Sequence, residues 1–521
     1  MHWQNLSNLL QIPVCMMILG LLALESRAPA APRSGELEIT VVDADTNEPM
    51  ACRMHLKNAR GRPRKAPKLP FLKDHFCFDG TLSMTLREGN YTFELECGPE
   101  YYTRTGHFSM DRAGSDTKTV SMKRIVDMSA EGWWAGDLHV HRRPEDIELL
   151  MRAEDLHVAQ VVTWSDKKDD LARKRVGAEL LTSFDTQRYY RILAGRDGRA
   201  SGGLSLFNLD KPLLALRADH GATAEYPPGI QLAEESGENK NVWFEAETLM
   251  AQDLPVWVAH NRLDSVRLAN HRYTRDGYID QEPSDRPRNS SIYAEANGLG
   301  RWSEFIYYQL LNCGLRIPPS AGSGSGDVPN PPGYNRVYVY CGKDFSYERW
   351  WEGLRAGRVV VTNGPLLRPL VEGQRPGHVF EGQAGKTLHL QPELKLATKD
   401  PIEYLEVVKN GRVENIVRLD EEAVRKGRLP RLTFDTSGWF LIRAVTNSGT
   451  TYRFASSGPY YVEFPNQPRI SRKAAQFFCD WVEQRMGKLE IDDRDQSQQV
   501  RAYHRRATDF WQDLRNRATT D

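Results

Sequence analysis

Residues 132–141 read Gly-Trp-Trp-Ala-Gly-Asp-Leu-His-Val-His, a short apolar segment that ends in two histidines one residue apart. Alternate residues of a β-strand point to the same side, so His139 and His141 would present both imidazoles together. Two imidazoles side by side are half of the ligand set that a divalent metal needs. Pro144 then precedes an apolar-periodic segment, which predicts a helix directly after the strand. This order is typical of β/α barrels, although a bare pair of histidines is also compatible with hydrogen-bonded structural residues.

The motif at residues 136–141, Gly-Asp-Leu-His-Val-His, resembles the first motif of the PHP (polymerase and histidinol phosphatase) metallohydrolases. It is most similar to the branch called CehA/McbA-like metallohydrolases. Three later stretches resemble the same branch: residues 255–260 (Pro-Val-Trp-Val-Ala-His), 310–323 and 357–365. The resemblance covers roughly residues 130–380. It implies a distorted β/α barrel that holds one to three metals and uses them for hydrolysis.

Several further residues are candidate metal ligands. His260 ends an apolar run that we expect to be a strand, and it matches the Ala-His of the family as a third ligand. Asp197 and Glu247 also end apolar runs, and each could supply a carboxylate or pair with a nearby arginine. His271 is a weaker candidate because it lies in an expected loop. Asp137 could orient one of the paired histidines without touching the metal.

The chain departs from the family pattern at most of the other ligand positions. The second motif usually carries Thr-Asp-His, but residues 163–165 read Thr-Trp-Ser. The late motif usually reads Ala-Gly-Ser-Asp-Ser-His, but residues 321–326 read Ala-Gly-Ser-Gly-Ser-Gly, with Asp327 next. The glutamate expected at the end of the third strand is Arg196. We therefore expect one divalent ion (Zn, Mn or Fe) on the three histidines and a carboxylate, or no metal at all.

The bulk composition sets limits on the class of protein. The 521 residues include 69 basic and 69 acidic side chains, so net charge gives no reason to expect nucleic acid as a partner. An apolar run at residues 12–24, followed by Ala-Pro-Ala at 28–30, predicts a secretory signal peptide over residues 1–30. Export to the periplasm or beyond follows, with no membrane span after cleavage. The first eleven residues lack Lys and Arg, which leaves an N-terminal membrane anchor as the alternative.

The chain divides into four predicted parts after the signal peptide. Short alternating strands predict a β-sandwich at 36–125 that resembles prealbumin-like carboxypeptidase regulatory domains. Near-continuous apolar runs predict the PHP-like β/α barrel at 130–365, a second β-sandwich follows at 366–465, and a helical segment ends the chain at 468–521. The fold class is therefore α/β plus β, a barrel flanked by two sandwiches.

Two functional hypotheses follow. The first is an exported metal-dependent hydrolase of ester, amide or phosphoester bonds, acting on a small molecule or a glycan. The alternative is a barrel that has lost catalysis and serves as a surface module for binding or scaffolding. The oligomeric state is left open.

Overall fold

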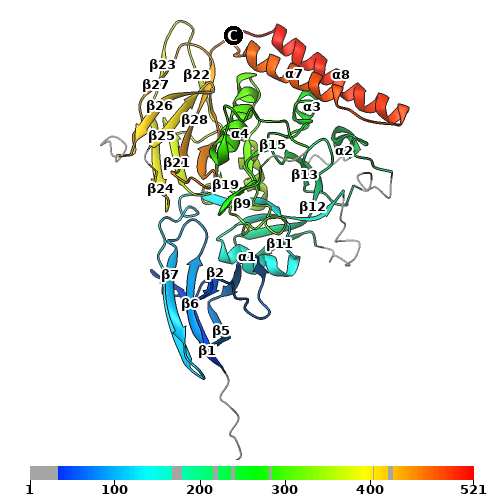
Figure 1. Cartoon of the computed structure of the whole chain (residues 1–521). Coiled ribbons are helices and arrows are strands. Elements are labelled where there is room, and N and C mark those ends of the chain that lie inside the picture. The colour runs from blue at the N-terminus through cyan, green and yellow to red at the C-terminus, as the bar shows by residue number, and fades with distance from the viewer. Residues whose placement is uncertain are drawn as a thin grey trace, which may run out of the picture.

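The computed structural model describes residues 33–166, 179–213, 215, 221–235, 241–280, 284–402, 404–419 and 426–521. The predicted signal peptide lies outside these residues. An N-terminal β domain lies at one end of the molecule and two C-terminal helices at the other (Figure 1). None of the described helices is both long and apolar enough to cross a membrane.

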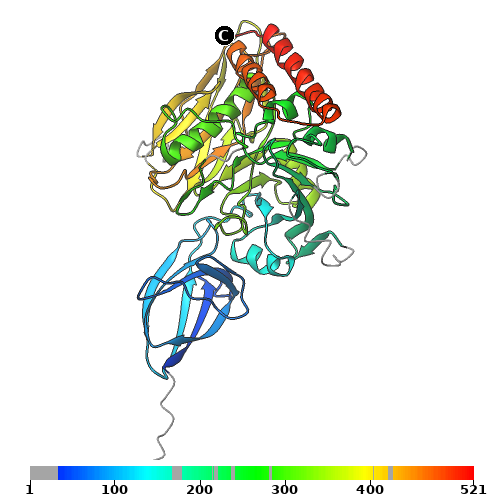
Figure 2. The same cartoon turned by 45° about the vertical axis from the view of Figure 1, so that its right-hand side comes forward.

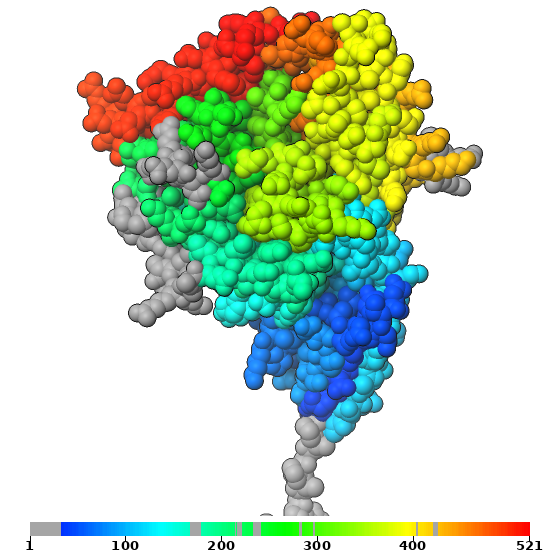
Figure 3. All heavy atoms as spheres, turned by 180° about the vertical axis from the view of Figure 1, so that it is seen from behind, coloured from blue at the N-terminus to red at the C-terminus, as the bar shows by residue number. Residues whose placement is uncertain are grey.

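The N-terminal domain is built from two sheets that share one apolar core. Its strands are β1 (Ser34–Asp43), β2 (Ala51–Asn58), β3 (Phe71–Leu72), β4 (His75–Asp79), β5 (Thr81–Arg87), β6 (Gly89–Glu96), β7 (Arg104–Met110) and β8 (Ser115–Met122). One sheet has the order β5-β1-β8 and the other β3-β4-β2-β6-β7. Leu37 and Ile39 from the first sheet pack with Met54 and Leu56 from the second, as the alternation of apolar residues predicts. Figure 3 shows this domain as a narrower lobe attached to the rest of the molecule.

A mixed sheet forms the centre of the molecule. Its strands are β9 (Trp133–Val140), β10 (Val158–Ser165), β11 (Leu181–Phe184), β12 (Arg188–Asp197), β13 (Leu204–Phe207), β14 (Trp243–Ala246), β15 (Ser265–Ala269), β18 (Pro319–Ala321), β19 (Arg336–Tyr340) and β20 (Val359–Thr362). The helices around it are α1 (Ile147–Ala153), α2 (Gly229–Glu235), α3 (Leu254–Ala259), α4 (Glu295–Asn312) and α5 (Tyr347–Arg355), and a small hairpin pairs β16 (Tyr273–Thr274) with β17 (Gly277–Tyr278). Strands β9, β10, β12, β14, β15 and β18 run in the same direction, because β13 pairs antiparallel with both of its neighbours.

The closed barrel that the sequence predicts is not observed. The sheet order runs β18-β15-β14-β13-β12-β10-β9-β19-β20 and then continues into C-terminal strands. Within the described residues no strand ladder joins β18 back to β9. Instead the loop after β18 meets the end of β9 through two main-chain hydrogen bonds, from His141 N to the Ser325 oxygen (2.7 Å) and from Gly324 N to the His139 oxygen (2.8 Å). The two ends of this part of the sheet are therefore joined by the loop after β18 and not by a strand ladder.

The C-terminal strands extend the central sheet. They are β21 (Leu366–Val371), β22 (Val379–Glu381), β23 (Leu388–Leu390), β24 (Pro392–Ala397), β25 (Tyr404–Lys409), β26 (Arg412–Arg418), β27 (Leu432–Phe434), β28 (Gly438–Val445), β29 (Phe454–Ser457) and β30 (Tyr460–Glu463). Strand β29 pairs with β20, and β28, β25 and β26 follow in order. The short β21–β24 and β23–β27 sheets pack against this extension in one apolar cluster that also includes Trp133 and Tyr338 of the central strands.

Two long helices close the chain. Ser471 caps α7 (Arg472–Gly487) by accepting a hydrogen bond from Ala474 N, and α8 (Arg494–Asn516) packs beside α7. The indole of Trp511 donates to the Pro255 oxygen, which fixes α8 against α3. Figure 2 shows both helices lying across the end of the molecule away from the N-terminal domain.

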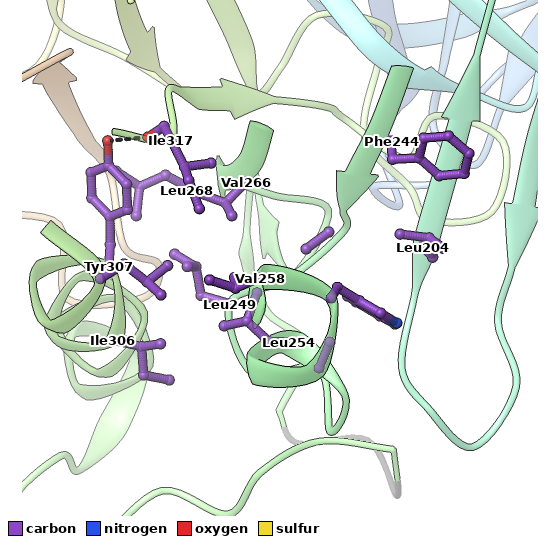
Figure 4. Close-up of a cluster of buried hydrophobic side chains, with 14 of the residues drawn as sticks. Leu204, Phe244, Leu249, Leu254, Val258, Val266, Leu268, Ile306, Tyr307 and Ile317 are labelled. Carbon is purple, nitrogen blue, oxygen red and sulfur yellow. Dashed lines mark hydrogen bonds between the residues drawn. The ribbon is translucent and has the colours of Figure 1, made fainter. Parts of the chain in front are cut away.

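The core around α3 and α4 shows why residues 254–259 are helical. Leu254 and Val258 of α3 face Leu249, Val266 and other apolar side chains (Figure 4). The sequence predicts a strand over residues 255–260 that ends at His260, and that prediction is wrong. Pro255 fits the first turn of a helix, and a six-residue apolar run cannot be assigned by periodicity alone.

Candidate functional site

Polar side chains gather where the parallel strands of the central sheet end. His139 lies near the end of β9, Arg196 near the end of β12, and Glu247 directly follows β14. Arg267 lies within β15 and Asp327 follows the loop after β18. The carboxyl ends of strands that run in the same direction meet at one edge of a sheet, so residues distant in sequence converge there. We call this set the central cluster: His139, His141, Arg196, Glu245, Glu247, Arg267, His271 and Asp327.

The two histidines of the motif lie against each other. The Nε2 atoms of His139 and His141 are 2.7 Å apart. The Nε2 atom of His139 is 3.6 Å from a carboxylate oxygen of Glu247, and that of His141 is 3.4 Å from one of Asp327. The ring of His271 lies 5.4 Å from that of His139, centroid to centroid. Three of the predicted ligands, His139, His141 and Glu247, are thus brought together, and Asp327 joins them.

Arg267 determines the protonation of this group. It is fully buried, and its Nη1 atom lies 2.8 Å from Nδ1 of His139. A guanidinium can only donate hydrogen bonds, so Nδ1 of His139 accepts. Burial, reinforced by the charge of Arg267, holds the pKa of His139 well below its usual range, so the ring is neutral. Its single proton is therefore on Nε2, between His141 and Glu247, where a metal ligand would need a lone pair.

Glu247 already has cationic partners. Arg196 Nε donates to one of its oxygens at 2.8 Å, and Ser205 Oγ donates to the other at 2.8 Å. Arg267 Nη1 is 3.9 Å away. Burial alone would raise the pKa of Glu247, but the two guanidiniums outweigh burial and lower it to about 2. The carboxylate is ionised, and its charge is compensated by arginines.

Asp137 acts on the main chain and not on an imidazole. Its buried carboxylate accepts hydrogen bonds from the backbone N–H groups of His139 and Ser323, both at 2.9 Å, and from Gly333 at 2.6 Å. The hydroxyl of Ser323 donates to it as well. Asp137 therefore holds the loop after β18 to the end of β9. The expected contact between Asp137 and a histidine ring is replaced by these backbone contacts.

His260 and Asp197 lie outside the central cluster. His260 follows the last residue of α3, and its Nε2 atom is 3.1 Å from the main-chain oxygen of Tyr503 in α8. Asp197 is completely buried, and both of its oxygens accept from Arg199, at 2.8 Å each. The one-metal site predicted on His139, His141 and His260 is therefore not assembled in this geometry.

A different group of metal-competent residues lies in the N-terminal domain. His55 on β2, His75 on β4 and Asp74 between β3 and β4 each offer one ligand atom, and these atoms lie within 4.8 Å of one another. Within the described residues such groups of three occur only in this domain, the second being His55 with Glu94 and Glu96. Burial lowers the pKa of His55 and lowers that of His75 to about 3. The structure thus contains a buried His/Asp/His group that could bind a metal.

Comparisons with known proteins add little to this geometry. No family model and no curated protein matches the chain. A solved structure of a streptococcal ancillary pilin matches 21% of this chain and 37% of its own, at 18% sequence identity and a TM-score of 0.15. A score this low supports no inference about fold or function.

Proposed function

We propose that the central domain is a binding module with a PHP-like, CehA/McbA-like framework in which arginines, rather than a metal ion, compensate the buried carboxylates. The observation that carries this proposal is the hydrogen bond from Arg267 Nη1 to Nδ1 of His139, at 2.8 Å. In a metal site the second ring nitrogen of a histidine normally donates to a carboxylate or a carbonyl oxygen. Here that nitrogen accepts from a cation, so the ring nitrogen facing the cluster carries a proton.

Electrostatics supports the same conclusion. A divalent ion beside His139 and Glu247 would lie close to Arg267, whose Nη1 atom is 3.9 Å from Glu247. Two unit charges about 4 Å apart interact by about 4 kcal/mol at an effective dielectric constant of 20. At such a distance Arg267 alone would repel a dication by on the order of 8 kcal/mol, which opposes the attraction of Glu247. Arg267 cannot move aside easily, because it is fully buried and also donates to Glu245 at 2.7 Å and to Ser205 at 3.0 Å.

The exposed rim of the cluster suits a small polar ligand such as a glycan. Asp327 is 40% exposed, Arg196 23% and His141 16%, and Asp327 lies within 3.9 Å of the other two. Together they offer a carboxylate acceptor, a guanidinium donor and an imidazole. A few convergent polar groups at the end of a sheet are typical of ligand sites that fix the hydroxyl groups of a ligand.

A panel of mono- and oligosaccharides, screened by thermal shift and followed by titration calorimetry, tests this proposal. We expect Asp327→Asn to weaken binding of any ligand found by tenfold or more. Asp344→Asn, a change at a carboxylate that is 84% exposed and lies outside the cluster, should leave the affinity unchanged. Equal affinity in both variants would show that the cluster is not the binding site.

The second candidate is a metal-dependent hydrolase of ester, amide or phosphoester bonds that uses one divalent ion (Zn, Mn or Fe). The approach of the two Nε2 atoms to 2.7 Å, beside Glu247 and Asp327, favours it. It requires Arg267 to release Nδ1 of His139. Elemental analysis separates the candidates: metal that is lost in a His139→Ala, His141→Ala double variant, together with loss of turnover, would favour the hydrolase.

We also propose that the protein acts outside the cytoplasm. The apolar run at residues 12–24 and the Ala-Pro-Ala that follows support an export signal, with an N-terminal anchor as the alternative. Mass spectrometry of the mature N-terminus distinguishes them, because cleavage near residue 30 would remove the run.

A further inference from the structure

The His/Asp/His group of the N-terminal domain is positioned by strand pairing. Strands β2 and β4 are antiparallel, with Met54 opposite Phe76, so His55 and His75 are the next residues across the ladder. Residues opposite each other on paired strands point to the same face of a sheet. The two imidazole centroids are 5.0 Å apart. Both histidines are buried, at 4% and 3% exposure, and His55 lies between Met54 and Leu56 of the apolar core, so its side chain points to the other face of β2.

Asp74 bridges the two rings. Its Oδ2 atom is 3.1 Å from Nδ1 of His55, and its Oδ1 atom is 3.1 Å from Nδ1 of His75. Ligands of a tetrahedral Zn²⁺ lie about 2.0–2.2 Å from the metal, which places neighbouring ligand atoms roughly 3.3–3.5 Å apart. The observed separations are a few tenths of an ångström shorter. One ligand atom from each of the three residues lies within 4.8 Å of the other two, so side-chain adjustment would let the three atoms surround one ion.

A small cavity adjoins these atoms at the junction of two domains. It is lined by His55, Asp74 and His75 from the N-terminal domain, by Thr274 and Arg275 from the β16–β17 hairpin and by Pro329 and Pro331. Its volume of about 20 Å³ leaves room for one ion or one water. The fourth position of a tetrahedral ion would therefore face the central domain.

The charged groups around the cavity do not exclude a cation. Arg53 contacts Glu96 and lies 2.9 Å from Glu154. Arg275 contacts Glu94 and lies 3.5 Å from Glu96. Both guanidiniums therefore have carboxylate partners of their own. Lys73 also lines the cavity, as does Asp276.

We propose that His55, Asp74 and His75 bind one Zn²⁺ ion at the junction between the N-terminal and central domains. The ligand atoms are Nδ1 of each histidine and one oxygen of Asp74. Two imidazoles and a carboxylate suit Zn²⁺, with water completing the tetrahedron. This site is separate from the central cluster and does not depend on the function proposed for it.

Zn²⁺ binding requires one local rearrangement. Each imidazole moves its proton from Nδ1 to Nε2. Nη1 of Arg275 now lies 3.0 Å from Nε2 of His55 and 3.3 Å from Nδ1, the proposed ligand atom. Two donors cannot face each other, and a guanidinium beside the ion would repel it, so Arg275 must turn away from His55 when Zn²⁺ binds. Arg275 is a quarter exposed and has space to do so, in contrast to the fully buried Arg267 of the central cluster.

The test uses Zn²⁺ alone as the probe on full-length protein stripped with a chelator. We expect the parent to bind one equivalent in titration calorimetry, and Asp74→Asn and His75→Gln each to weaken binding at least tenfold. The His139→Ala, His141→Ala double variant should bind like the parent, which assigns the ion to the junction. Circular dichroism and thermal melting of each variant establish that it is folded.

Co²⁺ substitution gives an independent readout that does not depend on activity. Tetrahedral Co²⁺ bound by nitrogen and oxygen absorbs in the visible range, and this absorption should appear with the parent and disappear in Asp74→Asn. Negligible uptake by the parent would overturn the proposal. The proposal would also be overturned if one equivalent of Zn²⁺ remained bound to both Asp74→Asn and His75→Gln. Loss of that equivalent in the His139→Ala, His141→Ala double variant would overturn it as well.

Discussion

The substitution Arg267→Met tests whether the buried guanidinium is the charge around which the central cluster is organised. Methionine keeps much of the aliphatic length of the side chain and removes every donor. It leaves the carboxylate of Glu245 buried without its cation, and it removes the donors to His139 and Ser205. Both Arg267 and Glu245 are completely buried, so water cannot replace the lost partner without local opening.

Removing one partner of a buried ion pair typically costs about 3–5 kcal/mol, because the other charge is left uncompensated. At about 2–4 °C per kcal/mol for a domain of this size, the melting temperature should fall by roughly 6–20 °C. A second change, Glu245→Gln, removes the uncompensated negative charge of Glu245. We expect the double variant to recover about 1–3 kcal/mol relative to the sum of the single changes.

Urea unfolding monitored by tryptophan fluorescence measures the differences in the free energy of unfolding. Differential scanning calorimetry measures the change in the melting temperature of the central domain. Arg349→Met is the matched control, since Arg349 is 54% exposed and its Nη1 atom lies 3.2 Å from a carboxylate oxygen of the exposed Asp344. Its loss should change stability by less than about 1 kcal/mol. If Arg267→Met cost no more than this control, the guanidinium would not be compensating the buried carboxylates, and the argument for a cationic substitute of a metal would fail.

Three further results are expected. Arg275→Gln should raise the affinity of the His55/Asp74/His75 site for Zn²⁺, because a glutamine oxygen can accept a hydrogen bond from Nε2 of His55 and a guanidinium cannot. A lower affinity in calorimetry would contradict this. The pKa of Glu247 is lowered from 4.5 to about 2 in the folded protein, so its ionised form contributes roughly 3 kcal/mol to the free energy of unfolding above pH 4.5. This contribution is lost as the pH falls toward 2. In urea unfolding measured at stepped pH, Glu247→Gln should flatten this part of the stability profile. Gly136→Ala should cost about 1–3 kcal/mol, because its Cβ would lie 2.3 Å from the Trp350 ring; an unchanged melting temperature would show that this packing can relax.

Part of the central cluster was predictable from sequence. An apolar run that ends in a polar residue places that residue at the carboxyl end of a strand, and parallel strands bring those ends together. This logic located His139, His141 and Glu247. It failed for His260 because a short apolar run is ambiguous between strand and helix, and the packing of α3 against α4 and α8 decided the outcome.

Other features could not be read from the sequence. Arg267 is the one charged residue in the strand Ser-Val-Arg-Leu-Ala, and a buried charge inside an apolar strand is a signal that it has buried partners, although not which ones. The pairing of His55 with His75 depends on the register of β2 and β4, which no local pattern encodes. Barrel closure likewise depends on which strands meet at the edges of a sheet.

The continuity of the central sheet sets a limit on how this protein can be divided. Because β20 pairs with β29, a chain cut after residue 365 would expose the backbone N–H and C=O groups of β20 as an open edge. Exposed edges of this kind recruit strands from other molecules and promote aggregation. Helices α7 and α8 share the apolar cluster of α3, so residues 130–521 form the smallest unit that should be expressed on its own or exchanged between homologues. Insertions that lengthen the chain are better placed in surface loops than at the apparent boundary near residue 365.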